Sequence, residues 1–142
     1  MEVVINYWAV LLSAVAAIGL GFAWFGPLFG KVWMKSIKIE MPTEMTKAMK
    51  QAMLRSYALV AVAALVMAAV LGHALFYVTE FTGLAGVSTG ITTALWCWLG
   101  FMVGPLMGPV LWEDRPWKYF FVTAGYWLVA LCIMGVILSV WQ

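Results

Sequence analysis

Residues 56–78 read SYALVAVAALVMAAVLGHALFYV and contain no Lys, Arg, Asp or Glu. About 20 apolar residues in a helix cross the ~30 Å hydrocarbon core of a bilayer, so this stretch is long enough to span a membrane. Three further uncharged apolar stretches occupy about 8–25, 89–111 and 119–141. Membrane barrel strands would be about ten residues long and alternate in polarity, and none of these stretches does so. The sequence predicts an all-α membrane protein with four transmembrane helices.

The composition agrees with a lipid environment. Of the 142 residues, 65% are hydrophobic and only 10% are charged, whereas soluble domains carry about 25% charged residues. A soluble protein of this size would have too few polar side chains to cover its surface. Disorder is excluded because the chain is rich in apolar and aromatic residues. The net charge of +2 is too small to indicate nucleic acid as a partner. We expect a single transmembrane domain over residues 1–142, in contact with the lipid bilayer.

The basic residues predict the orientation in the membrane. All eight lie in two loops, 26–55 and 112–118, while the N-terminus and the segment 79–88 have none. Successive loops alternate sides, so the two basic loops share one face, and the positive-inside rule places that face in the cytoplasm. Both termini are then outside. The residues concerned are Lys31, Lys35, Lys38, Lys47, Lys50, Arg55, Arg115 and Lys118.

A short amphipathic helix is predicted over residues 43–55, before the second span. Thr43 follows a proline and is a candidate N-cap. Methionines then recur every four residues, on one side of the helix; they are Met41, Met45, Met49 and Met53. Two interpretations remain open. The segment is a flexible Met-rich docking surface or a helix resting on anionic lipid, or it is a cytoplasmic extension of the second span packed on its own bundle.

Two segments of the chain resemble each other. Residues 21–33 and 100–112 share Gly-Phe, then Gly-Pro-Leu-x-Gly-x-Val, then Trp, when one-residue gaps are allowed. Each segment is followed by basic residues and an apolar helix. The pattern predicts two tandem helical hairpins, related as a parallel pseudo-repeat about an axis along the membrane normal.

The Gly-Pro pairs of these segments predict breaks in the helices, because proline lacks an N–H and clashes with the preceding turn. Pro27 is expected to mark the cytoplasmic end of the first helix, with Pro105 and Pro109 in the last turns of the third. The glycines of the first motif are Gly26 and Gly30. Such breaks are either plain helix termination or part of a transport site, where freed backbone groups line a cavity.

Small residues recur every four positions in three of the predicted helices. The rows are Ser13, Ala17 and Gly21 in the first helix, Ala64, Ala68 and Gly72 in the second, and Gly100, Gly104 and Gly108 in the third. Such rows let helix backbones approach closely in lipid. They predict packing inside one protomer, or a homo-oligomer (dimer or higher) or a subunit of a larger membrane complex.

His73 is the sole histidine and lies inside the second span. A titratable residue at membrane depth is a functional candidate. His73 could therefore relay a proton, or it could be the ligand of a bound pigment. The alternative is a neutral histidine bonded to a neighbouring helix. Ser13, Thr92, Thr93 and His73 are also the residues that would line a pathway at a protomer interface. The two cysteines, Cys97 and Cys132, have no metal-site spacing and are expected to behave as apolar side chains.

No catalytic signature is present. The sequence contains no Ser/His/Asp set, zinc-protease motif, P-loop or dinucleotide fingerprint, so we expect no enzyme activity, no metal and no cofactor. The leading hypothesis is a non-catalytic subunit that self-associates or accompanies a larger complex through its Gly/Ala/Ser faces. The alternative is a small-solute or ion channel or transporter. The third hypothesis is ligand or pigment binding through His73.

Several segments together resemble a known family. They are Ile5-Asn6-Tyr7-Trp8, Trp24-Phe25-Gly26-Pro27-Leu28-Phe29-Gly30 with Trp33, Glu113-Asp114-Arg115-Pro116, Ala124-Gly125-Tyr126 and Gly135. The chain resembles, over nearly its whole length, the bacterial four-helix membrane proteins grouped as domain of unknown function 1761. That resemblance implies four membrane helices and the cytoplasmic (inner) membrane of a prokaryote. It implies no activity.

Overall fold

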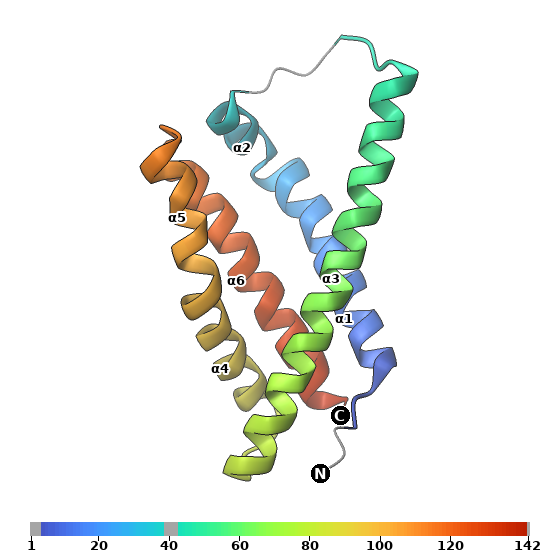
Figure 1. Cartoon of the computed structure of the whole chain (residues 1–142), viewed down its shortest axis with the longest axis vertical. Helices are drawn as coiled ribbons and strands as arrows, with labels where there is room; N and C mark the ends of the chain where they lie inside the picture. The colour runs from blue at the N-terminus through green and yellow to red at the C-terminus, as the bar shows by residue number, and fades with distance from the viewer. Residues whose placement is uncertain (1–3, 39–42, 142) are drawn as a thin grey trace.

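The computed structural model describes residues 4–38 and 43–141. In this part of the chain every regular element is helical, and four helices are long and apolar enough to cross a membrane. Figure 1 shows them as a bundle of four long rods, with both chain termini at one end and both basic connections at the other. The predicted all-α, four-span architecture is confirmed.

The spans are not all regular α-helices. The first consists of α1 (Tyr7–Ala23) and a π-helical segment, η1 (Trp24–Leu28), and is followed by a short helix, α2 (Gly30–Ile37). The second is one helix, α3 (Lys47–Thr82). The third consists of α4 (Val87–Cys97), a second π-helical segment, η2 (Trp98–Met102), and α5 (Val103–Trp112). The fourth is α6 (Trp117–Val140).

The expected amphipathic helix over 43–55 and the second span form a single rod. The N-cap of α3 is Thr46 rather than Thr43, because the Thr46 side chain accepts a hydrogen bond from the Met49 backbone N–H at 3.3 Å. The start of the methionine pattern, at residue 41, lies outside the described residues. Residues 50–60 of α3 are all exposed, and in Figure 1 this part of α3 leans away from the other helices. It therefore extends the second span without packing closely on the bundle.

The chain continues as a helix past Pro27, where the sequence predicted an end. Gly26 has a non-helical conformation (φ −98°, ψ −105°), and the Phe29 N–H donates to the Trp24 carbonyl five residues back, at 2.8 Å. This wide turn accommodates a proline, which has no N–H to donate. Gly30 then starts α2 with its Cα beside the Phe25 carbonyl oxygen, where a Cβ would collide. The Gly-Pro-x-x-Gly motif therefore redirects the helix instead of ending it.

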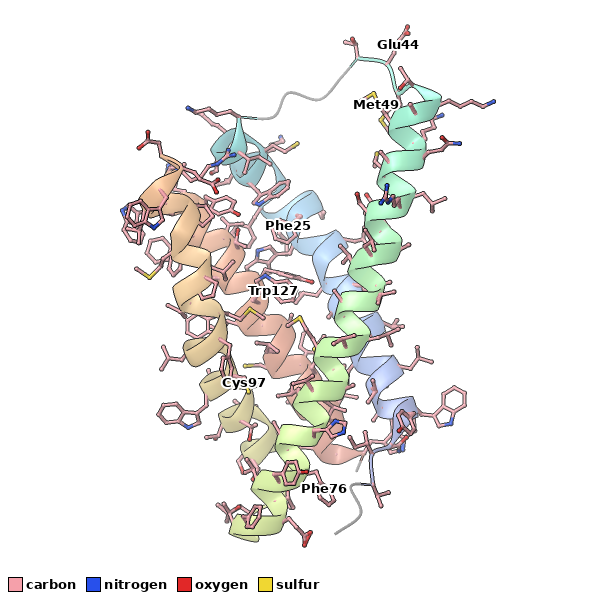
Figure 2. All side chains as sticks on the ribbon, in the orientation of Figure 1. Phe25, Glu44, Met49, Phe76, Cys97 and Trp127 are labelled. Atoms are coloured by element: carbon pink, nitrogen blue, oxygen red, sulfur yellow. The ribbon has the colours of Figure 1, made fainter. Side chains whose placement is uncertain are left out.

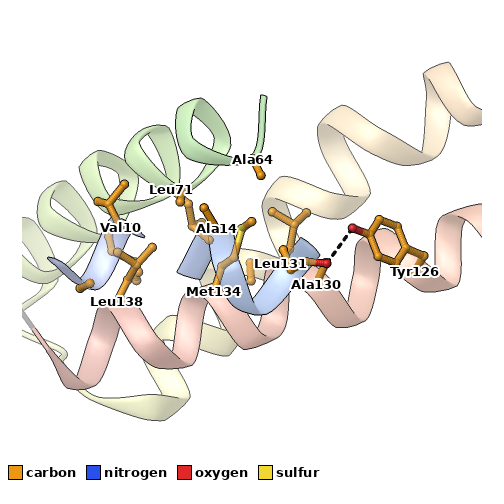
Figure 3. Close-up of a cluster of buried hydrophobic side chains, with 14 residues drawn as sticks. Val10, Ala14, Ala64, Leu71, Tyr126, Ala130, Leu131, Met134 and Leu138 are labelled. Carbon is orange, nitrogen blue, oxygen red and sulfur yellow. Dashed lines mark hydrogen bonds between the residues drawn. The ribbon is translucent and has the colours of Figure 1, made fainter. Parts of the chain in front are cut away.

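The core is centred on α6. Half of the 18-residue apolar stretch of this helix is buried. Helix α6 packs along both α1 and α4, and α3 packs along α1. Figure 3 shows small side chains such as Ala14 and Ala130 beside larger ones such as Leu71 and Met134. Alanines at these crossings let the backbones approach closely enough for the larger side chains to fill the space between them.

Helices α4 and α6 cross in close backbone contact at Gly90 and Gly135. A Cβ on either glycine would collide with the carbonyl oxygen of the other, and a Cβ on Gly90 would also lie 2.6 Å from the Ser139 hydroxyl oxygen. Neither glycine belongs to the small-residue rows that the sequence indicated. Backbone-to-backbone contact therefore fixes the third span against the fourth at a place the periodic pattern did not mark.

We predict that Gly135→Val will lower the free energy of unfolding by about 1–3 kcal/mol, because the added methyl groups must push α4 and α6 apart. The measurement is detergent-induced unfolding in mixed micelles, followed by circular dichroism. Gly19→Val is the matched control, because Gly19 is exposed and has no atom within 4 Å of its Cβ position. An equal loss in both variants would contradict a close crossing at Gly135.

Candidate functional site

Two tryptophans anchor the irregular parts of the first and third spans to α6. Trp24 opens η1, and its indole N–H donates to the Val122 carbonyl at 3.0 Å. Trp98 opens η2, and its indole N–H donates to the Ala124 carbonyl at 2.8 Å. The two acceptors are two residues apart on one helix. Both π-helical segments are therefore tied to the same short stretch of α6.

An aromatic cluster surrounds this stretch, and we define it as Trp24, Phe25, Trp33, Tyr126 and Trp127. The Tyr126 ring centre lies 5.0 Å from that of Phe25 and 4.9 Å from that of Trp127. The buried Tyr126 hydroxyl donates to the Ala17 carbonyl of α1 at 3.0 Å. Figure 2 labels Phe25 and Trp127 in the interior of the bundle, toward the end that carries the basic connections. The cluster joins α1, η1 and α2 to α6.

The geometry of the aromatic cluster fits a structural role. A π-helical segment disturbs the regular backbone hydrogen bonding, and lipid offers no partners to backbone groups. The indoles of Trp24 and Trp98 and the phenol of Tyr126 donate to backbone carbonyls of neighbouring spans, so the polar atoms of these three rings are engaged within the bundle. The arrangement holds two irregular spans in register on α6.

The structure separates the three small-residue rows. The rows of the first and second spans face the interior: Ser13, Ala17, Ala64, Ala68 and Gly72 are buried. Gly21, also in the first row, lies against Tyr126, whose hydroxyl oxygen would be 3.3 Å from a Cβ at that position. The third row faces outward. Gly100 and Gly104 are exposed, Gly108 is partly exposed, and a Cβ on any of the three would meet no atom within 4 Å.

The structure places the four candidate pathway residues in different surroundings within the protomer. Ser13 and Thr93 are buried, whereas Thr92 and His73 are exposed. Thr92 donates to the Ser88 carbonyl at 2.8 Å, and His73 Nδ1 lies 2.7 Å from the Ala69 carbonyl oxygen, one turn back on its own helix. One hollow of the described surface lies between the ends of α1, α3 and α6, and another lies on the face of α6 beside Cys132; none of the four residues lines either of these.

The two similar segments, 21–33 and 100–112, adopt different local conformations. In the first, Gly26 and Pro27 lie inside η1 and Gly30 is buried against a carbonyl. In the second, η2 ends before Gly104, Pro105 lies in the first turn of α5, and Pro109 lies within that helix. Cys97 and Cys132 are free and partly buried. The tandem repeat stays a prediction from the sequence.

We predict that Trp24→Phe and Trp98→Phe will each lower the free energy of unfolding by about 0.5–1.5 kcal/mol, the net contribution of one hydrogen bond. The phenyl ring keeps most of the packing and removes the N–H donor. Unfolding in mixed micelles measures the loss. Trp96→Phe is the control, because Trp96 is 69% exposed. If the control loses as much stability as Trp98→Phe, the bond to Ala124 is not the source.

Four membrane-length helices packed around a common apolar core define a small multi-span membrane protein. The family described as Protein of unknown function (DUF1761) matches residues 8–139. The chain belongs to this family, which confirms the resemblance drawn from the sequence motifs. Neither a curated protein nor a solved structure matches the chain.

Proposed function

We propose that this protein is a non-catalytic membrane subunit that associates with further copies of itself through its third span. The observation that carries the proposal is the uneven burial of the four spans. Each span contains an apolar stretch of 18 residues. In the third span only 6% of that stretch is buried inside the protomer, whereas in the fourth span 50% is buried. The glycine row of that span faces away from the rest of the chain.

Three glycines at four-residue spacing give the third span a flat strip about 12 Å long. In a bilayer, helix association depends on close van der Waals packing, and small residues allow the closest approach. The same device operates inside the protomer, where α4 meets α6 at Gly90 and Gly135. A second protomer seated on Gly100, Gly104 and Gly108 would repeat this mode of contact between subunits.

The two other hypotheses from the sequence depend on this association or compete with it. A solute pathway at a protomer interface requires the oligomer first. Pigment or ligand binding through His73 would use an outward-facing ring whose Nδ1 is already close to a carbonyl of its own helix. If the partner of the third span is a different membrane protein, the same face makes the chain an accessory subunit of a larger complex.

We also propose that the basic end of the bundle lies in the cytoplasm and that the membrane is the cytoplasmic membrane of a prokaryote. The described parts of the connections that carry the basic residues, 29–38, 43–46 and 113–116 with their flanking helix ends, lie at one end of the bundle (Figure 1). All eight Lys and Arg residues are found there. The positive-inside rule assigns such an end to the cytoplasm.

Gly104→Ile is expected to weaken self-association by about tenfold or more, because the branched side chain would hold the two helices apart. The measurement is the protein mass in mild detergent by light scattering, together with energy transfer between labelled copies in vesicles. Gly19→Ile is the matched control, since Gly19 is also exposed with open space beside it. A monomeric unmodified protein, or equal weakening by both substitutions, would refute association through the third span.

Labelling of single cysteines tests the orientation. In a chain with both native cysteines replaced by Ala, we expect Ala85→Cys to react with an impermeant maleimide in intact cells. Lys35→Cys should react only after the cells are opened. Both positions are exposed, so access to the reagent depends on the side of the membrane. The reverse labelling pattern would place the basic end outside.

A further inference from the structure

A cavity lies at the end of the bundle that is opposite the basic connections. It has a volume of about 270 Å³ and is partly open to the surroundings. Three helices contribute to it: the start of α1 with the residues just before it, the last three turns of α3, and the end of α6. These parts of the chain are far apart in sequence, and Figure 1 shows them together at the lower end. The cavity therefore exists only in the assembled bundle.

The cavity is lined mostly by apolar residues, and its polar residues are Asn6, Thr79 and Glu80. Ala9 and Leu138 on the floor are 0% and 4% exposed, and Gly72 between them is buried. A Cβ at the position of Gly72 would lie 3.6 Å from side-chain atoms of Ile5 and of Leu138, which both line the cavity, so a longer side chain there would occupy it. The exposed carboxylate of Glu80 stands at the rim. A ligand that fits would combine an apolar body with one polar group directed toward Glu80.

The charges around the cavity favour a cation. All eight basic side chains of the sequence belong to the opposite end of the molecule, and within residues 4–38 and 43–141 no basic group pairs with Glu80. Helices α3 and α6 both end beside the cavity, and the C-terminal ends of helices carry partial negative charge. The start of α1 has the opposite polarity, but the Asn6 side chain accepts hydrogen bonds from its first free N–H groups, those of Trp8 and Ala9.

Aromatic walls complete the site. Phe76 from α3 and Trp141 after α6 both line the cavity. The faces of aromatic rings attract ammonium groups, with tryptophan the strongest of them. A carboxylate, two aromatic rings and an apolar floor are the groups that recognise a quaternary or primary ammonium joined to a small hydrocarbon body.

We propose that this cavity binds an amphiphilic organic cation, with the ammonium group beside Glu80 and the apolar body over Gly72 and Leu138. Such a cation has two sources at a membrane surface. It is the ammonium headgroup of a phospholipid, or it is a free amphiphilic amine. The site stands on the cavity and its charges, so it is independent of the proposed self-association.

The test uses the full chain in a nonionic maltoside detergent, which carries no ammonium group. Benzyltrimethylammonium is the probe, and benzylsulfonate, which is similar in shape and opposite in charge, is the control ligand. Saturation-transfer NMR measures the dissociation constant of each. The informative variant is Glu80→Gln, and the matched control variant is Glu113→Gln, which removes an exposed carboxylate at the other end.

We expect saturable binding of the cation, weakened about fivefold or more by Glu80→Gln and unchanged by Glu113→Gln. Gly72→Leu, which fills the cavity, should remove the binding while circular dichroism shows whether the helices persist. Equal binding of benzylsulfonate, no saturable binding of the cation, or an unchanged dissociation constant in Glu80→Gln would overturn the proposal.

Competition then identifies the source of the cation. Displacement of the probe by added phosphatidylethanolamine would assign the site to a lipid headgroup. Displacement by octylamine without any effect of the lipid would assign it to a free amine. Either result supports a cation in the cavity.

Discussion

The bilayer offers no hydrogen-bond partners to the backbone, and this constraint governs the irregular parts of the bundle. Two of the four spans contain π-helical segments, each near a Gly-Pro pair. The indole N–H groups of Trp24 and Trp98 and the phenol O–H of Tyr126 donate to carbonyl oxygens of neighbouring helices. These carbonyls lie outside the π-helical segments, so the bonds satisfy the polar atoms of the rings and tie both segments to α6.

These cross-helix bonds make α6 the helix against which the first and third spans are positioned. The first span contacts it through Trp24 and Tyr126, and the third contacts it through Trp98 and through the glycine crossing at its other end. The second span contacts it less extensively. The face of the third span that points away from α6 is consequently not covered by any other helix of the protomer. This is why a Cβ on Gly100, Gly104 or Gly108 would meet no atom within 4 Å.

The sequence predicted what depends on the thickness and polarity of the bilayer. The lengths of the spans and the gathering of basic residues at one end follow directly from composition, because the solvent imposes them. It did not predict contacts that depend on the rotation and register of one helix against another. Gly90 and Gly135 lie 45 positions apart in the sequence numbering. Gly90 stands at four-residue spacing with Gly86 and Ala94, but such spacing does not say which helix the row will face. Nothing in the local pattern showed that they would meet.

The same limit applies to the candidate site. The helix break at Pro27 was visible as a motif, but its continuation into α2 depends on Gly30 approaching the Phe25 carbonyl. His73 drew attention as the single histidine, yet it faces outward. The cavity beside Glu80 was not predictable, because three helix ends from distant parts of the chain form it.

Helix α3 has a mechanical property that follows from its continuity. It has 36 residues without a proline or a break, which makes it about 54 Å long, or nearly twice the ~30 Å thickness of the hydrocarbon core. Its far end lines the cavity, while residues 50–60 project unpacked at the basic end. The part of this rod that contains Ala64 and Ala68 contacts the bundle, while its first turns have no such support. Because the helix is continuous, a tilt of about 10° about this contact would move the free tip by roughly 5 Å and the end beside the cavity by a similar distance.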